Sequence, residues 1–126
     1  MRPALLPDFL AGGIAFVDIE TTGGPAQRES ITEIGIVEVD EAGVREWATL
    51  LRPAMRIPDY IERLTGISND MVADAPRFED VADAVFDRLH GRLFVAHNAR
   101  FDHGYLRAAF RRVGMDIRPR VLCTVK

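Results

Sequence analysis

The 126-residue sequence contains little cysteine and has no excess of positive charge. Its single cysteine, Cys123, excludes an internal disulfide and a cysteine-rich zinc site, and it fits a reducing compartment. The formal net charge of −3 argues against a non-specific duplex binder, which needs many Lys and Arg contacts to phosphate. A nuclease is still compatible with this charge, because cations bound at a carboxylate site supply local positive charge.

The sequence also lacks a long hydrophobic run. Near the N-terminus, Pro7 and Asp8 interrupt the apolar residues, so we expect neither a secretory signal nor a membrane span. We expect a cytoplasmic protein without a membrane partner. Repeats and low-complexity tracts are absent as well, so residues 1–126 are predicted to form one small domain with one core.

The hydrophobic pattern predicts an α/β fold with a mixed sheet. We expect strands at 14–17, 31–39, 44–51, 93–96 and 121–123, and helices at 58–64, 78–89 and 101–113. The first and fourth strands are nearly all apolar, which is typical of strands buried on both faces. A hairpin followed by helical crossovers implies antiparallel early strands and parallel later ones.

Two carboxylates, Asp18 and Glu20, follow the first apolar run. Strand side chains repeat every two residues, so both project from one face of the sheet. Two adjacent anions favour a divalent cation between them, and Mg²⁺ prefers carboxylate oxygen. The alternative is a solvated strand-end charge beside a capping residue. Thr21, Thr22 and the glycines after them form a flexible loop whose main chain is suited to holding phosphate.

A third carboxylate, Asp102, is expected in the first turn of the helix that follows the fourth strand. The helix dipole alone could explain an acid there, but a neighbouring strand end would also bring it toward the first two acids. Asn98 either bridges the strand ends or caps this helix. We expect His97 to be packed and hydrogen-bonded, His103 to face away, and neither to be the catalytic base.

Residues 16–23 (FVDIETTG) and 97–102 (HNARFD) together resemble the first two motifs of the DEDD (DnaQ-like) 3′–5′ exonucleases. This family includes the proofreading epsilon subunits of bacterial DNA polymerase III. Residues 61–67 (IERLTGI) resemble the family's loop that wedges against terminal bases. The resemblance implies a ribonuclease H-like fold, in which a mixed five-stranded sheet is flanked by helices.

The resemblance also implies residue roles. Asp18 would bridge two divalent cations, Mg²⁺ or Mn²⁺, while Glu20 would bind one of them and Asp102 the other. The residues expected to line the nucleotide pocket are Thr21, Thr22, Leu64, Thr65, Asn98 and Phe101. The substrate would be a single-stranded or frayed 3′ end of DNA, with RNA as an alternative, and a DNA polymerase or repair complex is the expected partner.

The family's third motif, which carries a histidine or tyrosine and a fourth aspartate, is not found after Cys123. We therefore expect an incomplete exonuclease domain that lacks the C-terminal helix and has weak or no activity by itself. Two alternatives stay open: an exonuclease-like domain that only binds, and a haloacid-dehalogenase-like phosphatase with Asp18 as nucleophile. The second alternative fits less well, because the following strands are predicted to form a hairpin.

Overall fold

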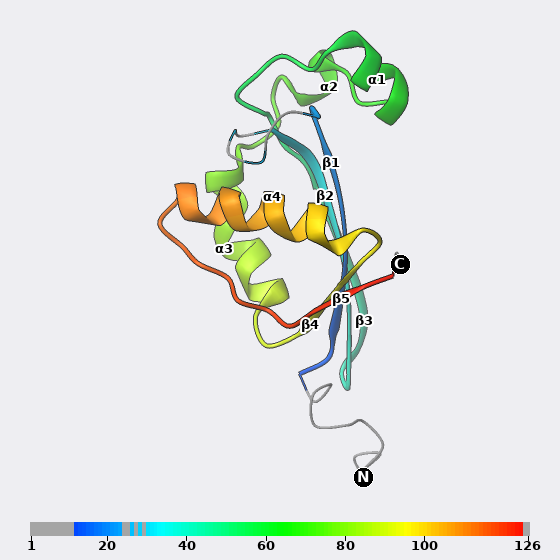
Figure 1. The fold of residues 1–126 in the computed structure, drawn as a ribbon, viewed down its shortest axis with the longest axis vertical. Helices are drawn as coiled ribbons and strands as arrows, with labels where there is room; N and C mark the ends of the chain where they lie inside the picture. Colours follow the sequence, from blue (N-terminus) through cyan, green and yellow to red (C-terminus); the bar gives the residue numbers. More distant parts are fainter. Residues whose placement is uncertain (1–11, 24–25, 27, 29, 125–126) are drawn as a thin grey trace.

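A five-stranded mixed sheet forms the centre of the molecule (Figure 1). The structure is a computed structural model that describes residues 12–23, 26, 28 and 30–124, with residues 99 and 100 described as main chain only. The strands are β1 (Ile14–Thr21), β2 (Ile31–Asp40), β3 (Gly43–Leu50), β4 (Leu93–Ala96) and β5 (Val121–Cys123). Their spatial order is β3-β2-β1-β4-β5, so the predicted mixed sheet is confirmed.

The strand directions follow the predicted pattern. β2 and β3 form a hairpin whose turn is fixed by Asp40, because its carboxylate accepts a hydrogen bond of 2.9 Å from the Ala42 N–H. β1 runs antiparallel to β2 and parallel to β4, and β4 runs parallel to β5. The antiparallel pairing of β1 with β2 argues against the haloacid-dehalogenase-like phosphatase alternative, which does not have this arrangement.

Within the described residues, four helices accompany the sheet: α1 (Asp59–Thr65), α2 (Asn69–Val72), α3 (Phe78–Leu89) and α4 (Ala99–Arg112). The sequence predicted all except α2, which is too short for a hydrophobic period. Helix α2 is capped by Ser68, the residue before it, whose hydroxyl accepts a hydrogen bond of 3.1 Å from the Met71 N–H. In the described ranges, every helix is too short or too polar to span a bilayer.

The core lies on one face of the sheet, beneath α3 and α4 (Figure 1). Alternate residues of β1, such as Val17 and Ile19, point into it. The prediction that β1 is buried on both faces is wrong, because Phe16 is 44% exposed on the other face. We call that second surface the open face; within the described residues no helix packs on it. Only alternate residues of this apolar run are covered, on the side where α3 and α4 lie.

One acid on the core face of β2 has arginine partners that the sequence did not indicate. Glu38 is buried, and one of its carboxylate oxygens lies 2.8 Å from Arg88 of α3. Its other oxygen is 3.5 Å from Arg92, and the Arg88 guanidinium lies 5.0 Å from the centre of the Trp47 ring. Removing one partner would leave a buried charge uncompensated, so this network joins the C-terminal half of α3 to the hairpin.

A second, smaller core holds α1 and α2 at the end of the sheet where β1 ends (Figure 1). It consists of the buried residues Ile57, Ile61, Ile67 and Val72. The loop after β1 touches it at Gly23, where an added Cβ would lie 3.0 Å from Ile61 Cδ1. Gly23 also has a φ of +86°, which side-chain-bearing residues rarely adopt.

Gly23→Ala is therefore expected to lower the free energy of unfolding by about 1–2 kcal/mol, measured by urea titration. Gly104→Ala is the matched control, because nothing lies within 4 Å of its added Cβ and the residue is inside α4. That control should stabilise the protein by up to about 1 kcal/mol. Equal effects of the two substitutions would contradict this account of Gly23.

Candidate active site

Three carboxylates meet where β1 extends past its parallel neighbour. β4 pairs with β1 only along Ile14–Phe16, whereas β1 continues to Thr21. Asp18 and Glu20 lie on this extension, on the open face, as their spacing predicted. Asp102, in the first turn of α4, is 5% exposed and accepts a hydrogen bond from the main-chain N–H of Ile19. The helix start thus occupies the strand edge that β4 leaves unpaired.

The three acids influence one another electrostatically. Burial and, to a lesser extent, the charges of Asp18 and Glu20 together raise the pKa of Asp102 to about 7, although the hydrogen bond from the Ile19 N–H opposes this shift. Burial also raises the pKa of Glu20, and the charges of Asp18 and Glu33 add to it. Asp18 contributes to both shifts, and Glu20 also acts directly on Asp102. The three acids thus lie within electrostatic reach of one another, and their convergence on one metal site stays a prediction.

Glu33 is an acidic neighbour that sequence reasoning missed. It lies on β2 directly opposite Glu20 in the antiparallel register. Like charges directly opposite each other destabilise a sheet. The sequence did contain a signal, because antiparallel pairing of β1 with β2 places a residue of 31–39 opposite each acid of β1. The strand register was needed to identify Glu33 as the residue opposite Glu20.

The raised pKa of Asp102 predicts a pH dependence of the metal-free protein. The folded state binds a proton at Asp102 that the unfolded state releases near its usual pKa of 3.8. Stability from this group is therefore fully present below about pH 4 and is lost as the pH rises through about 7. In EDTA, the free energy of unfolding from urea titrations should fall by a few kcal/mol, as an order of magnitude, between pH 5 and pH 8. Asp102→Asn should reduce this decrease. An unchanged pH profile in the variant would contradict the assignment.

The donor set fits a hard divalent cation. Among the described side chains, no Lys or Arg forms a salt bridge with any of the three acids, so their charge is not compensated within the described protein. Carboxylate oxygens are the preferred ligands of Mg²⁺. The described residues do not, however, gather three ligand side chains closely enough for a ready-made metal cage.

The residues flanking Asp102 are placed differently from what their types suggested. Asn98 precedes α4 with φ +60° and makes no side-chain cap, so the capping role is wrong. Asn is among the few residues that tolerate this conformation, and here it reverses the chain before α4.

His97 is hydrogen-bonded as predicted, with Nδ1 3.2 Å from Thr124 Oγ1, but it is exposed rather than packed. His103 is half-buried, with its ring edge-on to Phe94.

The two threonines after Glu20 are buried and their polar groups are engaged. Thr21 Oγ1 accepts a hydrogen bond of 3.0 Å from the Gly23 N–H. Thr22 Oγ1 donates to Met55 Sδ at 3.2 Å, and the Thr22 N–H donates to the Ser30 carbonyl at 2.9 Å. These bonds fix the loop in its present shape. A role for Thr21 and Thr22 in nucleotide binding stays a prediction.

Three other predicted pocket residues lie on α1 and α4. Leu64 is 79% exposed, and Phe101 is 41% exposed with its ring 4.5 Å from that of Tyr105. Thr65 is turned inward, because its hydroxyl donates to the Ile61 carbonyl at 2.9 Å and accepts from the Ile67 N–H at 3.2 Å. Leu64 and Phe101 are thus free to meet a ligand, whereas the Thr65 hydroxyl serves the end of α1.

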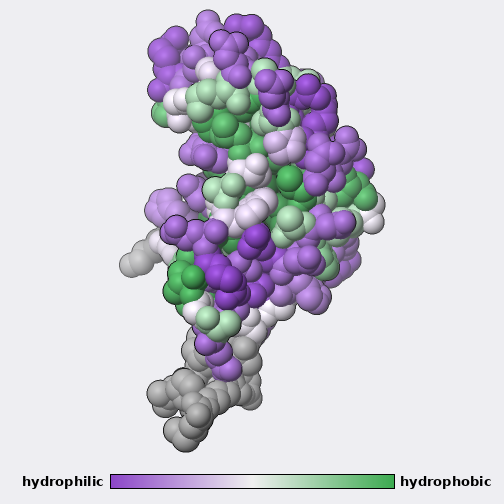
Figure 2. Space-filling model, turned by 180° about the vertical axis from the view of Figure 1, so that it is seen from behind, coloured by the Kyte–Doolittle hydropathy of each residue, from purple (hydrophilic) through white to green (hydrophobic). Residues whose placement is uncertain are grey.

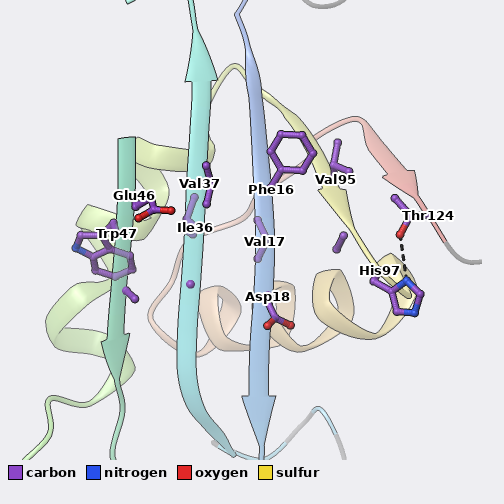
Figure 3. A pocket seen from close by; sticks show the side chains of 13 residues that line it. Phe16, Val17, Asp18, Ile36, Val37, Glu46, Trp47, Val95, His97 and Thr124 are labelled. Carbon is purple, nitrogen blue, oxygen red and sulfur yellow. Dashed lines mark hydrogen bonds between the residues drawn. The ribbon is translucent and has the colours of Figure 1, made fainter. Parts of the chain in front are cut away.

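A hollow on the open face adjoins Asp18 (Figure 3). Phe16 and Asp18 project from β1 on the same face, and the hydrogen-bonded pair of His97 and Thr124 lies to one side. Val37 of β2 and Val95 of β4 are the cross-strand partners of Phe16, which gives the hollow an apolar floor. Its volume is about 600 Å³. Viewed from behind, the molecule shows hydrophobic residues exposed among polar ones (Figure 2).

Known proteins match both the sequence and the fold. Residues 15–126 match the family described as RNase_T, exonuclease. A Mycobacterium tuberculosis protein, whose name proposes combined exonuclease and endonuclease activities, is 45% identical over 118 residues, covering 87% of this chain and 18% of that protein. The 3′-5′ exonuclease DinG of Bacillus subtilis is 39% identical over 103 residues, covering 80% of this chain and 11% of DinG.

A solved structure, exonuclease X in complex with 5′ overhanging duplex DNA, superposes with a TM-score of 0.67 at 28% identity. The match covers 88% of this chain and 59% of exonuclease X. The chain spans less than a fifth of the length of the two curated relatives. The narrower resemblance to a polymerase proofreading subunit stays a prediction. Sequence, fold and the placement of the two acidic motifs agree, and the chain belongs to the RNase T family of DnaQ-like (DEDD) exonucleases.

Proposed function

We propose that this domain hydrolyses phosphodiester bonds from the 3′ end of single-stranded or frayed DNA, using two divalent cations, Mg²⁺ or Mn²⁺. The observation that carries the proposal is the meeting of Asp18, Glu20 and the buried Asp102 at the unpaired edge of β1. Support for DNA comes from the related exonuclease X, whose structure contains duplex DNA with a 5′ overhang.

In this proposal, Asp18, Glu20 and Asp102 would hold the cations, since the three acids lie within electrostatic reach of one another. Bound cations supply an activated water and stabilise the negative charge that develops at the phosphate. The Ile19 N–H keeps the Asp102 carboxylate pointed at the strand end. Burial limits the access of water to Asp102, which strengthens its electrostatic interactions. We assign no general base among the described residues.

A single-stranded oligonucleotide labelled at its 3′ end, and a second one labelled at its 5′ end, test the proposal. We expect release of the 3′ label as a mononucleotide with Mg²⁺ or Mn²⁺, progressive shortening of the 5′-labelled strand, and neither in EDTA. Release of the 5′ label first, or cleavage that does not need a cation, would contradict it. A parallel RNA oligonucleotide distinguishes the two nucleic acids.

The expectation that the chain is only part of a catalytic domain stays a prediction, and full activity of the 126 residues alone would contradict it. The binding-only alternative is tested by calorimetric titration with Mn²⁺, since a domain without a functional carboxylate site should show no binding. A polymerase or repair complex as partner, and a cytoplasmic location, also stay predictions.

A further inference from the structure

Helix α1 is seated directly on the loop that leaves the acidic strand. The contact is made by Ile61, whose Cδ1 lies 3.0 Å from the position of an added Cβ on Gly23. Gly23 follows Glu20 by three residues, and Thr21 and Thr22 between them are held by the hydrogen bonds described above. The position of α1 relative to the carboxylates is therefore fixed by packing.

The outer surface of α1 presents two large side chains that the fold does not need. Tyr60 is 61% exposed and Leu64 is 79% exposed. They are four residues apart, so they lie side by side on one face of the helix. The Tyr60 hydroxyl is 3.9 Å from the added Cβ position on Gly23, which places the tyrosine over the loop after Glu20. In Figure 2, hydrophobic residues show among polar ones in the upper part of the molecule, the end where α1 and α2 lie.

The charges on α1 indicate which part of a nucleic acid could be bound there. Asp59 and Glu62 lie in its first turn and Arg63 in its last, and Asp59 pairs loosely with Arg56 at 3.9 Å. Such a surface has no surplus of cations for phosphate. The faces of the bases are uncharged, and they stack on aromatic rings whatever the base sequence.

We propose that Tyr60 is a base-stacking residue, whose ring carries one of the last two nucleobases of a single strand while the 3′-terminal phosphodiester lies at the carboxylates. This inference rests on the proposed function. Leu64, one turn further along α1, would touch the neighbouring base. The ring carries the interaction in this arrangement and the hydroxyl does not, so phenylalanine should replace tyrosine without loss.

The test uses the 126-residue chain with Asp18→Ala, in Mg²⁺, so that the oligonucleotide is bound without being consumed. Fluorescent 2-aminopurine is placed at the last or at the penultimate position of a single strand. We expect its fluorescence to be quenched on binding when Tyr60 is present. With Tyr60→Ala the quenching should be lost at one of the two positions, and the Kd should rise about tenfold or more. Tyr60→Phe should behave like the parent.

Tyr60→Leu guards against loss of the fold, because it keeps the bulk of the side chain and should lose quenching with an unchanged circular dichroism spectrum. Val44→Ala, an exposed apolar residue on β3, is the control and should alter neither quantity. Unchanged quenching and Kd in Tyr60→Ala, or equal losses in Tyr60→Phe and Tyr60→Ala, would overturn the stacking role. Failure of the proposed function is a separate result. It would be seen if the chain that retains Asp18 bound no Mn²⁺ in calorimetric titration while 2-aminopurine was still quenched.

Discussion

Asp18→Ala is expected to lower kcat/KM for release of a 3′ nucleotide by about a thousandfold or more, which corresponds to about 4 kcal/mol of transition-state stabilisation. The reason is the position of this acid between the other two. Its charge raises the pKa of Glu20 and of Asp102, so it lies within electrostatic reach of both other acids. Single-turnover cleavage of a 3′-labelled strand in Mn²⁺ gives the measurement.

Calorimetric titration with Mn²⁺ gives the same test where turnover of the unaltered chain is too slow to measure. The variant should lose the Mn²⁺ site. Asp83→Ala is a suitable control, because Asp83 is an exposed acid of α3. This substitution should change neither the cleavage rate nor Mn²⁺ binding. Cleavage and Mn²⁺ binding that both survive Asp18→Ala would refute the proposed role.

The same variant should have an opposite effect on folding. Without a cation, the charge of Asp18 disfavours ionisation of the buried Asp102, so removing Asp18 lowers the pKa of Asp102 toward its usual value. The metal-free variant should therefore lose less stability than the parent between pH 5 and pH 8. Substitution of a residue that serves only the fold would not both abolish function and increase stability. Substitution of one acid in a binding site made of mutually repelling acids should do both.

The sequence predicted those parts of the site that depend on local periodicity. Asp18 and Glu20 share a face because strand side chains alternate. Asp102 lies in the first turn of α4, where an apolar period of 3.6 residues starts. That Asp102 reaches the unpaired edge of β1 depends on β1 being longer than β4. Relative strand length is set by long-range pairing, which local periodicity does not specify.

Other features were out of reach for the same physical reason. Glu38 shares a strand face with Ile34 and Ile36, but its arginine partners could not be identified from the sequence. Arg88 and Arg92, about fifty positions away in the chain, compensate its buried charge. The open face was not foreseen because an apolar run shows that side chains can be buried, but not on which side of the sheet other elements lie. The hydroxyls of Thr21 and Thr22 suggested contacts with a ligand, whereas the structure engages them within its own loop.

Phe110→Ala is expected to have the largest effect on stability, a loss of about 3–5 kcal/mol in the free energy of unfolding. Phe110 is fully buried on α4, and its ring lies edge-on to Phe78 at 5.0 Å and to Phe86 at 6.3 Å, both on α3. The substitution removes apolar contact, leaves a cavity and deletes two aromatic pairs. A domain of this size has about 5–15 kcal/mol in total, so urea titration should show a large shift of the midpoint.

Phe101→Ala is the matched control, since it removes the same side chain from the same helix at a position that is 41% exposed. Its loss should be below about 1 kcal/mol, because little apolar surface returns to water and no core cavity forms. The pair of variants also separates stability from function. Phe101→Ala should weaken binding of a single strand in a chain that stays folded, whereas Phe110→Ala releases the helix that positions Asp102 and should weaken Mn²⁺ binding as the fold is lost. Equal losses of stability in the two variants would show that α4 is not held by the aromatic contacts with α3.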